Sequence, residues 1–338
     1  MTKVTLKDIA DKLNISISTV SRALDDNPNI SVRTHEKVWN AARAMGYVSD
    51  THFAKDGLKQ SNLIGVIVPK LSYHLYAMVI SGIENILEQR GMHILICQSN
   101  ESFEREKTLI EELIAVGVNG VIVSIASETK EFGHFEKLKS RNIPLVFFNR
   151  ECNAIRTDKV VIDNRKVAHE AVNHLIAIGC ENIAYLGGPE SLQINLERAQ
   201  GYKDALEENS IPIKEENVVF SKFDKESMLS AARKLLYAPN YPDGILTFSD
   251  QIAINLMVAA KERGIAIPEK LSVIGFNNEP VGELIEPSLT SIDQPAYQMG
   301  QEAAELLLKQ MENENESFEK RILKSFLVVR KSTNRNRT

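Results

Sequence analysis

The sequence predicts a small all-α N-terminal domain followed by an α/β core of two doubly wound, parallel-sheet lobes. Residues 1–48 contain only short helical patterns, whereas the chain from residue 63 onward alternates β-rich runs with amphipathic segments of helix length. Such alternation is typical of parallel sheets covered by helices. The runs are too many for one ordinary open sheet, and 338 residues are enough for two lobes and a smaller domain.

Capping residues delimit the helices of the first domain. Thr5 and Asp8 form a capping-box pattern ahead of an apolar stripe, Ser16 can cap a second helix, and Ser31 can cap a third. Residues 49–62 lack a strong apolar period. We therefore predict a headpiece over 1–48 and a hinge or linker over 49–62.

The core alternates short β-rich runs with segments of helical apolar spacing. The predicted strands are 63–68, 93–97, 120–124, 144–148, 159–162, 182–187, 244–248, 271–276 and 325–329. The predicted helices between them are 76–90, 104–116, 165–178, 225–237, 250–263 and 297–311.

The composition is that of an ordinary globular protein, with 43% hydrophobic and 25% charged residues. No apolar run reaches the roughly 18 residues of a membrane span, and the N-terminus carries charges where a signal peptide has its apolar segment. We therefore expect a cytoplasmic protein with no membrane partner. Cys97, Cys152 and Cys180 are scattered, which fits reduced thiols and predicts no disulfide, metal or cofactor.

Charge is distributed unevenly along the chain, whose net charge is −5. Residues 1–60 carry nine Lys/Arg and seven Asp/Glu, whereas the remainder carries 31 and 38. An acidic body with a slightly basic head can still bind DNA through the head.

Residues 5–24 contain two short helices joined by a tight turn, which is the arrangement that places a second helix across the DNA major groove. On that helix Arg22 can donate two hydrogen bonds to guanine, and Ile17 offers an apolar contact to a thymine methyl. The hydroxyls of Ser16, Thr19 and Ser21 can hold phosphates. A small helical cap without a nucleic-acid role has the same local pattern, so the motif alone leaves both interpretations open.

The detail of this segment resembles the headpiece of the lactose-repressor (LacI) family of bacterial transcription regulators. The matching residues are Val4-Thr5-Leu6, Asp8-Ile9-Ala10, Ser16, Thr19-Val20-Ser21-Arg22, Arg33, Glu36-Lys37-Val38 and Gly46-Tyr47. Further matches run along the core, among them IGVIVP (64–69), GVNGVIVS (117–124), IAYLGGP (183–189), PDGILTFSD (242–250) and PSLTSIDQP (287–295).

The resemblance implies a core shaped like a periplasmic sugar-binding protein, with three crossings between its lobes near 162, 291 and 322. The N-lobe would then comprise residues 63–162 and 292–322, and the C-lobe residues 163–291 and 323–332. The remaining residues, 333–338, are expected to form a polar tail.

The hinge departs from the family pattern of an Ala followed three residues later by a Leu that wedges into the minor groove. Without gaps these positions are Phe53 and Asp56, and a carboxylate would be repelled by phosphates. Leu58, four residues after Ala54, can take the role if the register shifts; otherwise the linker inserts nothing. The positions expected to contact DNA are Thr5, Leu6, Ser16, Ile17, Ser18, Thr19, Ser21, Arg22, Asn29 and Leu58.

The resemblance also implies a ligand site between the lobes, and several of its residues follow a predicted strand, where open α/β sheets bind ligands. Arg198 and Asp250 are expected to be its main polar contacts. Two family carboxylates are amides here, Asn149 and Asn277, which relaxes the penalty on an anionic ligand and leaves both a sugar and a sugar phosphate open. The predicted set is Ser72, Tyr76, Asn149, Arg198, Phe223, Asp250, Asn277 and Gln294.

These observations predict a ligand-responsive transcription regulator, a homodimeric repressor of carbohydrate-utilisation genes that binds double-stranded operator DNA. A dimer is expected because one recognition helix contacts too little DNA for specificity. The alternative is a sugar-binding transport component with the same core fold and no DNA function. An enzyme is not expected, since the sequence has no GxGxxG after the first strand, no P-loop, no HExxH and no GxSxG elbow.

Overall fold

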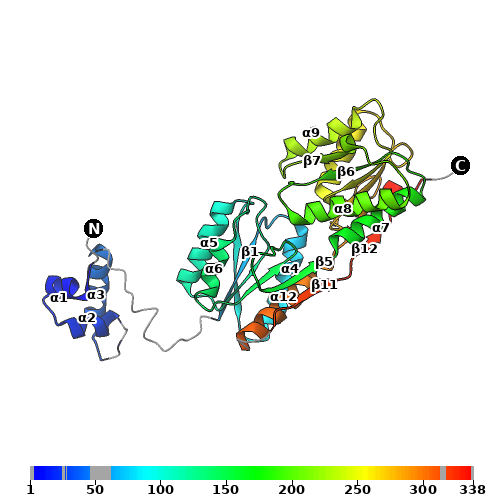
Figure 1. Cartoon of the computed structure of the whole chain (residues 1–338). Helices are drawn as coiled ribbons and strands as arrows, with labels where there is room; N and C mark the ends of the chain where they lie inside the picture. The colour runs from blue at the N-terminus through cyan, green and yellow to red at the C-terminus, as the bar shows by residue number, and fades with distance from the viewer. Residues whose placement is uncertain (1–3, 25–26, 28, 46–61, 313–316, 336–338) are drawn as a thin grey trace. The chain divides into compact units, whose positions relative to one another are not determined.

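The computed structural model describes residues 4–24, 27, 29–45, 62–312 and 317–335. The chain divides into an N-terminal unit, residues 1–61, and a core, residues 62–338 (Figure 1). The hinge positions Phe53 and Asp56 and the candidate contact Leu58 lie outside the described residues.

The N-terminal unit contains the three predicted helices, α1 (Leu6–Leu13), α2 (Ile17–Leu24) and α3 (Val32–Met45). The capping box at the start of α1 is present, with Thr5 N donating to the Asp8 carboxylate at 2.7 Å and Asp8 N donating to Thr5 Oγ1. Ser16 Oγ accepts from Thr19 N at 3.1 Å and thereby caps α2. The helices enclose a small apolar core formed by Ile9, Ala10, Val20, Ala23, Leu24, Val38, Ala41 and Ala42.

The N-lobe of the core is a parallel sheet with the strand order β11-β5-β4-β3-β1-β2. Its strands are β1 (Leu63–Val68), β2 (His93–Gln98), β3 (Gly120–Val123), β4 (Leu145–Phe148), β5 (Asp158–Ile162) and β11 (Lys320–Leu323). Its helices are α4 (His74–Glu88), α5 (Phe103–Val116), α6 (Gly133–Lys139) and α12 (Ala296–Glu312).

The C-lobe sheet has the order β12-β10-β9-β8-β6-β7 and is parallel except for β12, which runs antiparallel to β10. Its strands are β6 (Ile183–Gly187), β7 (Val218–Phe220), β8 (Gly244–Thr247), β9 (Ser272–Phe276), β10 (Thr290–Asp293) and β12 (Phe326–Val328). Its helices are α7 (Asn164–Ala177), α8 (Gln193–Glu208), α9 (Lys225–Leu236), α10 (Asp250–Glu262) and α11 (Val281–Leu284).

Three connections join the lobes, as the strand memberships require. The chain leaves the N-lobe sheet after Ile162, returns after Asp293, and leaves again between Leu323 and Phe326. The second crossing lies two residues beyond the predicted position, because Ile292 still pairs with Phe276 inside the C-lobe sheet. Among the described residues, no helix is long and apolar enough to cross a membrane.

Candidate functional site

Helix α2 presents a polar outer face. Val20, Ala23 and Leu24 are buried, whereas Ile17, which is 48% exposed, faces outward together with Ser18 and Arg22. Of the other positions predicted to contact DNA, Thr5, Ser16 and Asn29 are exposed, and Leu6, Thr19 and Ser21 are half-buried. The Ser16 hydroxyl caps α2 through Thr19 N, and it also lies 2.8 Å from the hydroxyls of Ser18 and Thr19.

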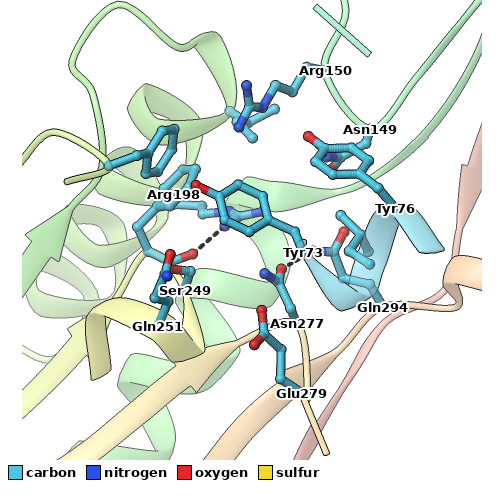
Figure 2. Close-up of a pocket in the computed structure, with 14 residues that line it drawn as sticks. Tyr73, Tyr76, Asn149, Arg150, Arg198, Ser249, Gln251, Asn277, Glu279 and Gln294 are labelled. Carbon is cyan, nitrogen blue, oxygen red and sulfur yellow. Dashed lines mark hydrogen bonds between the residues drawn. The ribbon is translucent and has the colours of Figure 1, made fainter. Parts of the chain in front are cut away.

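The core contains a pocket between the two lobes that encloses about 450 Å³, part of it open to solvent (Figure 2). Six of the eight predicted ligand residues lie in its walls: Tyr76, Asn149, Arg198, Phe223, Asn277 and Gln294. Ser72 is exposed outside the walls, and Asp250 is buried behind them. Sequence reasoning missed the other lining residues, which are Tyr73, Leu75, Arg150, Ile194, Phe248, Ser249, Gln251 and Glu279.

Arg198 projects from α8 and is only 2% exposed. Its Nε donates to Asn164 Oδ1 at 2.9 Å, and its Nη1 donates to the carbonyl oxygen of Phe248 at 2.6 Å. The guanidinium also lies 3.4 Å from the centroid of the Phe276 ring. Burial, together with the nearby positive charge of Arg150, lowers the pKa of Arg198 to about 9.

Arg150 enters the pocket from the N-lobe as half of a buried ion pair. Its Nη1 and Nη2 donate to the two oxygens of Glu101 at 2.7 and 3.0 Å. Burial alone would raise the pKa of Glu101, but the guanidinium and a hydrogen bond from Ser127 N outweigh it and lower that pKa. The Arg150 guanidinium lies 5.4 Å from the ring centroid of Phe223, which belongs to the C-lobe.

Asp250 supports the pocket wall from behind. Its carboxylate accepts hydrogen bonds of 2.6 Å from Ser291 Oγ and from Glu279 N. Gly275 leaves room for it, because a Cβ there would lie 1.9 Å from Asp250 Oδ1. Burial raises the pKa of Asp250 to about 7.

Two of the pocket amides follow directly after strands and adopt a left-handed backbone. Asn149 follows β4 with φ 56°, and Asn277 follows β9 with φ 105°. Asn tolerates this region better than most residues, so backbone geometry is one reason for an amide at each position. In the walls, Gln294 Nε2 donates to Asn277 Oδ1 at 2.7 Å, and Asn149 Nδ2 donates to the Tyr76 hydroxyl at 3.4 Å.

A helix-turn-helix unit together with a two-lobed core around a polar pocket defines a class of DNA-binding regulators that respond to a ligand. Comparisons with known proteins agree with this class. Residues 5–50 match the family described as bacterial regulatory proteins, lacI family, and residues 172–333 match the periplasmic binding protein-like domain. The chain belongs to the lacI family.

Individual relatives cover nearly the whole chain. The chain is 32% identical over 332 residues to the HTH-type transcriptional regulator DegA of Bacillus subtilis, covering 98% of each protein. It is 33% identical to the HTH-type transcriptional repressor CytR of Escherichia coli, covering 98% of this chain and 97% of the relative.

Solved structures agree with these relatives. The CelR–cellobiose complex has a TM-score of 0.75 at 26% identity and covers 98% of this chain and 100% of that chain. The lac repressor dimer bound to operator and an anti-inducer has a TM-score of 0.73 at 25% identity, with coverage of 98% and 99%. The protein is therefore a DNA-binding transcription regulator and not an enzyme or a transport component.

Proposed function

We propose that this protein is a homodimeric repressor of carbohydrate-utilisation genes whose operator affinity changes when a sugar binds between the lobes. The observation that carries the proposal is the pocket, which draws polar and aromatic side chains from both lobes. Relatives support the ligand class: the ribose operon repressor of Halalkalibacterium halodurans is 30% identical over 330 residues. A lacI-family regulator from Enterococcus faecium with bound ribose has a TM-score of 0.71 at 29% identity and covers 80% of this chain and 98% of its own. The protein would act in the cytoplasm, where its operator lies.

The exposed face of α2 would read the operator. Arg22 would donate to guanine and Ile17 would contact a thymine methyl, and Ser18 is exposed beside them. The half-buried Thr19 and Ser21 would approach phosphates at the edges of the groove.

Exposed apolar residues in both lobes support a dimer. Leu95 and Ile96 are 37% and 41% exposed on β2, the edge strand of the N-lobe sheet. Val281 and Leu284, 41% and 84% exposed, lie on α11 in the C-lobe. Exposed apolar side chains at a sheet edge and on a short helix are available for contact with a second copy, which would supply the second recognition helix.

Ligand binding in the pocket would affect DNA binding by changing how the two lobes close on each other. Ser191 Oγ of the C-lobe donates to the carbonyl oxygen of Ser127 in the N-lobe at 2.7 Å. Ser127 N in turn donates to Glu101, the partner of Arg150 in the pocket wall. A ligand that touches both walls would favour one lobe arrangement and thereby change operator affinity by linkage.

The experiment is a gel-shift assay with DNA from upstream of the protein's own gene, with and without individual sugars. We expect binding of two protomers per site and a shift in affinity with at least one sugar. A thermal-shift screen would select the sugar, since ligand at 100 times its Kd stabilises the protein by about 2.7 kcal/mol. Failure to distinguish this DNA from random DNA would contradict the proposal.

A further inference from the structure

Three buried polar atoms in the pocket walls lack a hydrogen-bond partner among the described residues. They are the Tyr73 hydroxyl, Arg150 Nε and Gln294 Oε1. Arg150 Nε can only donate, Gln294 Oε1 can only accept, and the Tyr73 hydroxyl can do both. Because buried polar groups are nearly always paired, these atoms favour a ligand that both donates and accepts hydrogen bonds.

The same walls hold one carboxylate outside the Arg150–Glu101 ion pair. Glu279 lines the pocket and makes no side-chain hydrogen bond or ion pair within the described parts of the chain. Burial raises the pKa of Glu279, and nearby His74 offsets this only in part. A carboxylate in this position can accept a hydrogen bond from a ligand hydroxyl.

The charges of the pocket balance without a ligand. Arg150 is neutralised by Glu101, which leaves the positive charge of Arg198 and the negative charge of Glu279. A sugar phosphate would leave the site with an excess of negative charge close to Glu279. Arg198 offers limited compensation, because its Nε and Nη1 already donate to Asn164 and to the Phe248 carbonyl.

We propose that the pocket takes an uncharged polyhydroxyl ligand, and that Glu279 determines specificity by accepting a ligand hydroxyl and excluding phosphorylated or acidic forms. Hydroxyl groups both donate and accept, so such a ligand satisfies Arg150 Nε, Gln294 Oε1 and Glu279 together. A phosphate or carboxylate group mainly accepts, so an anionic group that faces Gln294 Oε1 or Glu279 leaves that acceptor unpaired, and beside Glu279 it also places like charges together. This inference rests on the proposed role of the pocket as a sugar-effector site.

The test is calorimetric titration of the full chain with matched pairs: ribose and ribose 5-phosphate, glucose and glucose 6-phosphate, and cellobiose, with glucuronate as an acidic sugar. We expect at least one uncharged sugar to bind and its phosphate, or glucuronate, to bind at least about tenfold more weakly. Glu279→Gln should reduce that preference about fivefold or more, because the amide keeps the size and removes the charge. Glu279→Asp should retain the exclusion of the phosphate while weakening the uncharged sugar.

Glu286→Gln is the matched control, since Glu286 lies in the same segment and pairs with Lys331 at the surface. It should leave the preference unchanged, and thermal unfolding should show that every variant folds as the parent does. Tighter binding of a phosphate or of glucuronate than of the uncharged sugar would overturn the ligand class and leave the regulator function standing. An unchanged preference in Glu279→Gln would overturn the role of Glu279. If no sugar of either kind binds, both this inference and the proposed effector class are wrong.

Discussion

Arg22 is the exposed side chain of α2 that can form two parallel hydrogen bonds with guanine. We expect Arg22→Ala to cost about 1–3 kcal/mol at the specific operator and much less on random DNA. Fluorescence anisotropy with both DNAs at fixed salt measures the two losses. Lys12→Ala, which removes one charge from α1, is the control for net charge. Equal losses on both DNAs in Arg22→Ala would mean that Arg22 contacts only phosphate.

Asp250 makes the stability of the core depend on pH. Burial raises its pKa from 3.8 to about 7 in the folded state, so the folded protein binds this proton more tightly than the unfolded chain. The contribution of Asp250 to the free energy of unfolding therefore falls as pH rises from about 4 to about 7. Urea unfolding should show Asp250→Asn gaining stability relative to the parent across this window.

Ser291 provides the check on this pH dependence. Its hydroxyl donates to Asp250 and favours the charged carboxylate, so Ser291→Ala should raise the pKa of Asp250 further and extend the loss of stability to higher pH. A constant difference between Asp250→Asn and the parent from pH 4.5 to 7.5 would contradict the assignment.

At the scale of the element, helices α4 and α12 touch through glycines. A Cβ at Gly82 would lie 2.1 Å from Tyr297 O, and one at Gly300 would lie 2.0 Å from Val79 O. We expect Gly82→Ala and Gly300→Ala each to destabilise the core by about 1–3 kcal/mol, because the helices must separate. Gly133→Ala is the control, since no atom lies within 4 Å of its Cβ position. Denaturant unfolding measures the stability of all three variants. If Gly82→Ala and Gly300→Ala were as stable as Gly133→Ala, the close packing of α4 and α12 would be contradicted.

Most elements of the core could be predicted because their apolar spacing follows burial directly. Three of the segments that sequence analysis missed, α8, β11 and β10, have clear physical reasons. Helix α8 buries the polar residues Asn195 and Arg198, which breaks its apolar period. Strand β11 (KRIL) is an edge strand with an exposed, charged start, and β10 (TSID) carries a single apolar residue.

The sequence predicted where most site residues lie in the fold better than it predicted where their side chains point. The family resemblance indicated Asn149 and Asn277, which directly follow strands, whereas Arg150 and Glu279 lie one and two residues further along and carry no separate pattern. Asp250 stands at the start of α10, as expected, but its carboxylate turns toward Ser291 and Glu279 N. Side-chain direction at a helix start depends on partners that are distant in the sequence.

At the scale of the whole molecule, operator binding and pocket occupancy form one linked equilibrium. A ligand changes operator affinity only if the DNA-competent and incompetent arrangements bind it unequally, and the operator must then change ligand affinity by the same factor. Arg198 is the residue whose loss should uncouple the two, because it lies in the pocket and belongs to the core rather than to the DNA-binding unit.

The most direct test measures the operator Kd of the parent and of Arg198→Ala, each with and without a saturating sugar identified by the thermal-shift screen. We expect the sugar to change the operator Kd of the parent by about 5–150-fold, with the same factor in sugar affinity when operator is present. Arg198→Ala should bind operator like the sugar-free parent and respond weakly or not at all. A sugar that binds the parent tightly and leaves its operator Kd unchanged would contradict the linkage between the pocket and operator binding.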